Sequence, residues 1–94
     1  MIFLKEHLTG LHYSWASNVS TALFTGDPSR RLFDRLNGDQ VLFMINFFGQ
    51  SVGKLSLSDG QRVEKLIISE LPELIKSEMA VFNWLREVYL YYWN

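Results

Sequence analysis

Apolar side chains in the first quarter of the chain recur every three or four residues, from Leu4 to Ala22. This spacing places them along one stripe of an α-helix, and Trp15, in the middle of the stripe, is predicted to belong to the core. Gly26 is suited to end the helix. Pro28 is suited to begin another, because the first helical turn leaves unpaired the N–H that proline lacks.

The middle of the chain contains two further helical patterns. Residues 29–36 predict a short second helix, because the Asn37-Gly38 pair that follows is suited to a left-handed C-cap. Asp39 is then placed to cap a third helix, in which residues 41–52 are apolar on nearly every side. A helix of this kind lies centrally in a core or in an oligomer interface.

Residues 41–58 have a second interpretation, which we keep open. The apolar run that ends at Phe48 is followed by Gly49, by Gly53 and by alternating apolar and polar residues. Such a pattern also fits two β-strands joined by a turn. The alternative to an all-α fold is therefore an α+β fold with one β-hairpin at about 41–58.

A capping pattern introduces the next predicted helix. Ser58 and Gln61 have the spacing of a capping box, in which a serine and a glutamine each satisfy an unpaired N–H of the first turn. The helix that follows carries apolar residues at 63, 66, 67 and 71, and Pro72 is expected to end or kink it.

The last helix is predicted from Glu73 to about Trp93. Its broad apolar face, which includes Phe82 and Tyr89, is assigned to the core. Glu78 projects near the middle of that face, where a carboxylate without a partner would be costly. Either an arginine or histidine from another helix meets Glu78, or this stretch opens to solvent or to a pocket, and we favour the structural pairing.

Length and composition agree with one folded domain over residues 1–94. The chain is 48% hydrophobic and 20% charged, which is typical of a globular protein and not of a disordered one. The pattern as a whole predicts an all-α fold, a compact bundle of four or five helices. A formal net charge of -1 supplies no general attraction to nucleic acid or to an anionic membrane.

The absence of cysteine and the shortness of the apolar runs indicate the cellular compartment in which the protein is expected. No cysteine is present, which excludes disulfides and thiolate metal ligands and fits a reducing cytoplasm. The first seven residues lack the pattern of a secretory signal, and the apolar run at 41–48 is far shorter than the ~20 residues that cross a bilayer. We expect a cytoplasmic protein without membrane insertion.

Candidate chemical motifs fail on spacing. Gly49 and Gly53 are separated by three residues, not the four of a phosphate-binding loop, and Leu55 stands where that loop needs serine or threonine. His7 and His12 are five residues apart and do not stack as metal ligands on a helix would. We expect no catalytic residue, no metal and no cofactor, and therefore no enzyme.

Three arginines fall within the predicted second helix, at 30, 31 and 35. Arginine suits phosphate and carboxylate recognition. Two of the arginines also lie four residues from an aspartate, Arg31 from Asp27 and Arg30 from Asp34. We therefore interpret this cluster as a solvated helical face with ion pairs.

Aromatic residues make up 15% of the chain, and four of them point away from the predicted core faces. Trp84 and Tyr91 share a flank of the last helix, and Phe43 and Phe47 share the opposite side of the third helix. Rigid aromatic anchors are typical of protein interfaces, although a wider core would also use them. The sequence predicts a noncatalytic regulatory or adaptor protein that acts through protein–protein interaction as a homodimer, with these four residues in the interface.

Two other functions remain open at this point. The same four aromatic residues suit a cavity for a small apolar ligand, which would make the protein a carrier. A DNA-binding transcriptional regulator would place the helix after Asp59 in a groove of the duplex. Nucleic acid is the less favoured partner, because that helix carries Glu64 and Glu70 as well as Arg62 and Lys65.

Overall fold

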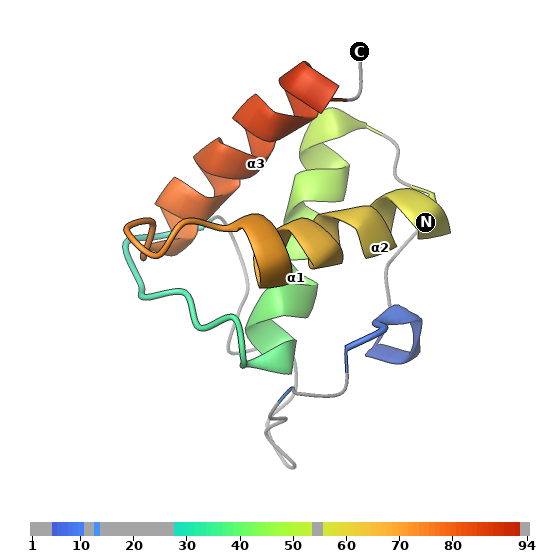
Figure 1. The fold of residues 1–94 in the computed structure, drawn as a ribbon, viewed down its shortest axis with the longest axis horizontal. Helices are drawn as coiled ribbons and strands as arrows, with labels where there is room; N and C mark the ends of the chain where they lie inside the picture. The colour runs from blue at the N-terminus through green and yellow to red at the C-terminus, as the bar shows by residue number, and fades with distance from the viewer. Residues whose placement is uncertain (1–4, 11–12, 14–27, 54–55, 93–94) are drawn as a thin grey trace.

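A computed structural model describes residues 5–10, 13, 28–53 and 56–92 of the chain. This part is all-α, with no β-strand, and its three α-helices are α1 (Gly38–Val52), α2 (Leu57–Lys65) and α3 (Glu78–Tyr92) (Figure 1). The all-α prediction is confirmed. The hairpin alternative at 41–58 is wrong, because residues 41–52 lie within α1.

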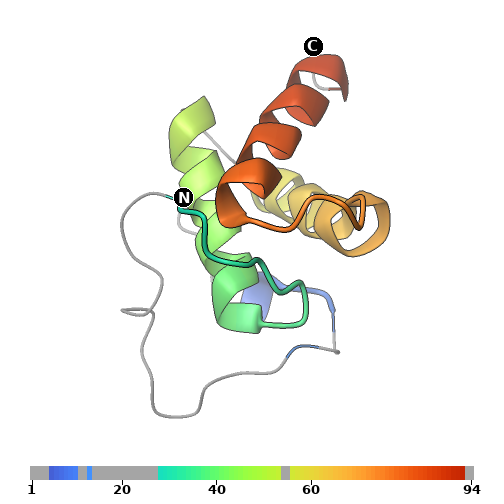
Figure 2. The same ribbon diagram turned by 90° about the vertical axis from the view of Figure 1, so that its left-hand side faces the viewer.

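The central helix is α1, and both α2 and α3 pack against it. In Figure 1, α2 crosses in front of α1, and Figures 1 and 2 together show α3 inclined to α1. This position explains why α1 is apolar nearly all round, as the sequence predicted for a core helix. The buried core side chains of the three helices and of the turn η3 include Val41, Met44, Ile45, Phe48, Val63, Ile67, Val81 and Leu85.

The ends of α1 are set by Asn37 and Gly53. The Asn37 side chain accepts a hydrogen bond from the Gln40 N–H at 3.2 Å, which makes Asn37 the N-cap in place of Asp39. Gly38 is the first residue of α1 and does not end an earlier helix. Gly53 has φ +94°, a backbone conformation that favours glycine, and its N–H donates to the Gly49 carbonyl.

The N-cap of α2 is also displaced by two residues from its predicted position. Ser56 Oγ accepts from the Asp59 N–H at 3.2 Å, so Ser56, and not Ser58, caps the helix. The helix continues into a π-helical turn, η3 (Leu66–Glu70), in which the Leu71 N–H donates to the Leu66 carbonyl. Helical structure then stops before Pro72, as predicted.

Residues 29–36 do not form the predicted second helix. Residues 29–33 lie beside the segment before α3, where the Phe33 N–H donates to the Lys76 carbonyl at 2.6 Å and the Glu78 N–H donates to the Arg31 carbonyl at 2.9 Å. A turn over residues 34–37 follows. Backbone groups used in this pairing are not available to bonds within a helix. The last helix consequently begins at Glu78 instead of Glu73.

The continuous helix predicted over residues 4–22 is wrong where it can be compared. A 3₁₀ turn, η1 (Lys5–His7), is followed by nonhelical backbone at residues 8–10 and 13. The N–H groups of Thr9 and Gly10 donate to the Glu64 side chain instead of to helical carbonyls. Trp15 and the rest of that predicted helix lie outside the described residues.

Of the helices in the described part of the chain, none has the length and apolar character needed to cross a bilayer.

Candidate functional site

Glu78 is fully buried and meets an arginine, as the sequence predicted. Arg31 Nε donates to Glu78 Oε2 at 2.8 Å, and the Gln40 side chain donates to the same oxygen at 2.8 Å. The Ser29 N–H donates to Oε1 at 3.1 Å. Burial acts to raise the pKa of Glu78, but the hydrogen bonds from Arg31, Gln40 and Ser29 together hold it below its ordinary value.

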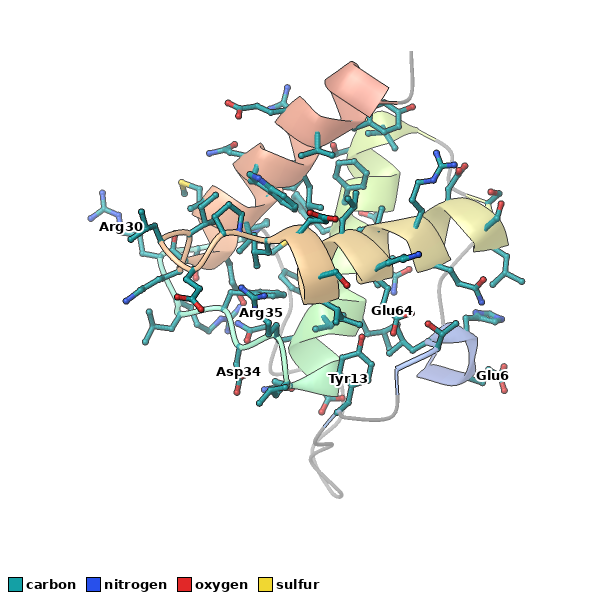
Figure 3. All side chains as sticks on the ribbon, viewed as in Figure 1. Glu6, Tyr13, Arg30, Asp34, Arg35 and Glu64 are labelled. Carbon is teal, nitrogen blue, oxygen red and sulfur yellow. The ribbon has the colours of Figure 1, made fainter. Side chains whose placement is uncertain are left out.

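The three arginines therefore do not share the predicted solvated face. Arg31 pairs with Glu78, and the Arg35 guanidinium donates to the carbonyls of Ile68 and Leu71 at the end of η3. Arg30 points away from the fold in Figure 3. The arginine prediction failed because it assumed a helix over residues 29–36.

Glu64 is the second fully buried carboxylate, and its partners are neutral. It accepts hydrogen bonds from the N–H groups of Thr9 and Gly10, from the Thr9 hydroxyl at 2.9 Å and from the Tyr13 hydroxyl at 2.6 Å. Figure 3 shows Tyr13 directed at Glu64. Burial, followed by the hydrogen bond and the charge of Glu64, raises the pKa of Tyr13 above its ordinary range.

Both carboxylates are engaged by donors at both of their oxygens. A carboxylate has about four lone-pair positions, and the donors around Glu64 and Glu78 occupy them. Each side chain therefore connects segments that are distant in sequence, and neither is placed to accept a proton from a substrate. Across the described residues, no cluster of three His, Asp or Glu side chains could hold a metal ion.

The backbone at Gly49 and Gly53 does not have the conformation of a phosphate-binding loop. Gly49 is a helical residue of α1 and Gly53 is its C-cap, so these glycines do not form a loop around an anion. An open hollow of about 520 Å³ lies along α2 and η3, and most of its lining residues have polar side chains. It is lined by Thr9, Ser58, Gln61, Arg62, Lys65, Ile68 and Ser69.

The feature best suited to recognition is an open groove of about 520 Å³ between α1 and α3. We call it the aromatic groove. Three residues near the end of α1 and three residues of α3 line it: Phe47, Ser51, Val52, Phe82, Arg86 and Tyr89.

Ring packing fixes the floor of the aromatic groove. Phe47 contacts Phe82 edge to face with ring centroids 5.2 Å apart, and the buried Phe48 contacts Phe82 at 6.4 Å and Tyr89 at 5.6 Å. Edge-to-face pairs at these distances are favourable beyond the area that they bury. The Arg86 guanidinium lies 5.8 Å from the centroid of the Phe82 ring, within cation–π range.

The structure brings together two of the four predicted interface residues. Phe43 and Phe47 are neighbours, with ring centroids 6.2 Å apart, and Phe47 lines the aromatic groove. Trp84 lies two residues, about 200° around the helix, from Phe82 and packs half-buried against the core, so it does not join the groove. Tyr91 belongs to the last turn of α3, and its side chain lies outside the described part.

Five of the six residues that line the groove were not predicted as interface residues, and three of the five belong to α3. Phe82 and Tyr89 were assigned to the core face of the last helix, and Arg86 was not singled out. Their spacing of four and then three residues marks one side of a helix, and a cation among aromatic residues distinguishes that side from a core face.

Comparison of the chain with known proteins finds no matching family model, no matching curated protein and no matching solved structure.

Proposed function

We propose that this chain is a noncatalytic regulatory or adaptor protein that acts through protein–protein interaction, with the aromatic groove as its binding surface. The observation that carries the proposal is the groove itself, in which Phe47 and Phe82 are held by ring packing beside the exposed Arg86. Aromatic residues and arginine are the side chains most enriched at the centres of protein interfaces.

The occupant that we propose is a second copy of the chain. Large apolar side chains in the described residues remain exposed, among them Leu74 at 92% and Leu32 at 72%. Exposed apolar surface of this kind is commonly covered by association, and two-fold dimers are the most frequent assemblies. The compact bundle of four or five helices predicted from the sequence belongs to the same proposal.

A carrier of a small apolar ligand is the second candidate. The volume of the aromatic groove, about 520 Å³, falls within the range of small-molecule sites. Such sites enclose most of their ligand, however, whereas this groove is open at the surface. Protein binding is therefore the better-supported function, and we propose neither nucleic acid nor a cofactor as a partner.

The proposal is tested by blocking the groove at an exposed position. Ser51→Arg places a long charged side chain in the groove without removing a core contact, because Ser51 is exposed. Gln50→Arg is the matched control, since Gln50 is exposed in the same turn but about 100° around the helix.

Sedimentation velocity over a range of concentrations should show a dimer for the unmodified chain and for Gln50→Arg, and a monomer for Ser51→Arg. Circular dichroism should be unchanged in both variants, and so should melting at a concentration low enough that every variant is monomeric, because association itself raises the melting temperature. A dimer that persists in Ser51→Arg would exclude the groove as the interface, and an unmodified chain that stays monomeric would exclude the homodimer.

A further inference from the structure

We propose that each copy in the dimer inserts its own turn before α3, carrying Glu73 and Leu74, into the aromatic groove of the other copy. The two α3 helices then lie antiparallel around a two-fold axis. This inference rests on the proposed function, because it names the element that fills the same groove.

The turn presents an apolar side chain next to a carboxylate. Leu74 is 92% exposed, the highest value among the large apolar side chains of the described residues, and Glu73 beside it is exposed as well. The Ile75 N–H donates to the Pro72 carbonyl, and Ile75 packs against the core. The turn therefore holds Leu74 outward in a fixed position, which lowers the entropy lost on binding.

The groove has the complementary chemistry. Its floor is made of aromatic rings, which suit a leucine side chain, and the one charged residue that lines it is Arg86. A carboxylate that enters beside the leucine can pair with Arg86, and charge complementarity of this kind fixes the register of an interface.

The turn that carries Glu73 and Leu74 is too far from the aromatic groove of its own chain to fill it. Figures 1 and 2 both show the turn at the base of α3, whereas the groove lies along the helix toward its C-terminal end. From Glu78 to Arg86 the helix rises about 12 Å, so the turn cannot reach the groove of its own chain.

Antiparallel packing of the two α3 helices allows the grooves of both copies to be filled at the same time. In a two-fold interface, if a residue i of one copy contacts a residue j of the other, then j also contacts i, so both turns find a groove. Met79, Asn83 and Arg86 recur at four and three residues and are all exposed, which gives α3 an outward stripe for this packing. A parallel pair would instead place Arg86 against Arg86.

A charge exchange tests the pairing directly. Sedimentation equilibrium is measured for the unmodified chain, for Glu73→Arg, for Arg86→Glu and for the double variant that carries both changes. Each single change should weaken dimerisation about tenfold or more, and the double variant should recover most of the loss, because the pair is restored with its signs reversed. Glu6→Arg, at an exposed site in η1, makes the same change of charge as Glu73→Arg and should leave dimerisation unchanged.

Leu74→Ser supplies a second measurement that does not depend on charge. It should also weaken dimerisation and leave the melting of the monomer unchanged, because Leu74 buries almost nothing in the single chain. If Ser51→Arg prevents dimerisation but Glu73→Arg and Leu74→Ser do not, another element or another protein fills the groove, and the inference is overturned while the proposed function stands. If the double variant dimerises no better than the single variants, the Glu73–Arg86 pairing is overturned. If Ser51→Arg has no effect, the groove proposal itself fails.

Discussion

Glu64 and Glu78 are both fully buried, but their charges are compensated differently. Glu78 is paired with the Arg31 guanidinium, whereas Glu64 is surrounded by the neutral donors of Thr9, Gly10 and Tyr13. Removing a carboxylate from water is costly in either case. A cation compensates the charge itself, whereas neutral donors compensate only through hydrogen bonds directed at the oxygens.

The two clusters also connect different parts of the molecule. Around Glu78 the nonhelical segment 28–36, α1 and α3 meet, and the buried Gln40 side chain joins them by donating to both Glu78 and the Leu32 carbonyl. Around Glu64 the N-terminal segment is fastened to α2. The difference predicts that disrupting the Glu78 cluster destabilises the whole fold, whereas disrupting the Glu64 cluster releases the N-terminal segment alone.

The largest effect should follow from Arg31→Ala. It leaves Glu78 buried without its cation, and we expect a loss of about 2–4 kcal/mol of unfolding free energy. This is below the cost for a wholly buried pair, because 38% of the Arg31 side chain is exposed and solvent screens its charge.

Denaturant unfolding followed by circular dichroism measures the loss. Arg30→Ala is the matched control, since Arg30 is exposed and should change the unfolding free energy by no more than about 0.5 kcal/mol. Equal losses in the two variants would show that the ion pair contributes nothing to the fold.

A smaller and local effect is expected for Glu64→Gln. The amide keeps the size of the side chain but has one acceptor oxygen, and its NH₂ would face the N–H groups of Thr9 and Gly10. We expect a cost of about 1–3 kcal/mol, carried by the N-terminal segment.

Amide hydrogen exchange resolves where the cost appears. Exchange at residues 9 and 10 should accelerate, and exchange in α1 and α3 should stay as in the unmodified chain. Glu70→Gln, an exposed position at the end of η3, should leave every amide unchanged. Uniform acceleration across the three helices would contradict a local role for Glu64.

These contacts explain which parts of the fold the sequence could predict. The helix α1 can be recognised from the sequence because its apolar residues continue over four turns. Apolar residues on nearly every side indicate a central helix whatever packs against it. The caps of α1 and α2 were each misplaced by two residues, because Asn37 and Asp39, like Ser56 and Ser58, are all suitable N-cap residues. Local propensity does not decide between such neighbours.

Residues 28–36 were mispredicted for a different reason. Their conformation depends on backbone pairing with residues 76–79, more than 40 positions away, and on Gln40 and Glu78. The pattern of apolar and polar residues within this short segment cannot indicate a backbone pairing with residues so distant in sequence. The groove was predicted only in part for a similar reason: Phe43 and Phe47 were identified on one helix, but Phe82 looked like core until its position beside Phe47 was known.

The acid sensitivity of the fold tests the Glu78 cluster most finely. The pKa of Glu78 is lowered from 4.5 in the folded protein, so the unfolded chain takes up a proton on this residue at a higher pH than the folded chain does. The stability that Glu78 contributes is therefore fully present above about pH 4.5 and is lost as the pH falls through the folded pKa. One such group changes the unfolding free energy by at most about 1.4 kcal/mol per pH unit.

The difference between the unmodified chain and Glu78→Gln isolates this contribution, because the other carboxylates titrate in both. The unfolding free energies of the unmodified chain and of Glu78→Gln are measured from pH 7 to pH 3. The difference between them should be smallest at the acidic end, where Glu78 becomes protonated and resembles the amide. The same series on Arg31→Ala should show a shallower decline near pH 4, because the guanidinium that holds the pKa of Glu78 down has been removed. A pH profile of Arg31→Ala that parallels the unmodified chain would show that Gln40 and Ser29, and not the ion pair, control the protonation of Glu78.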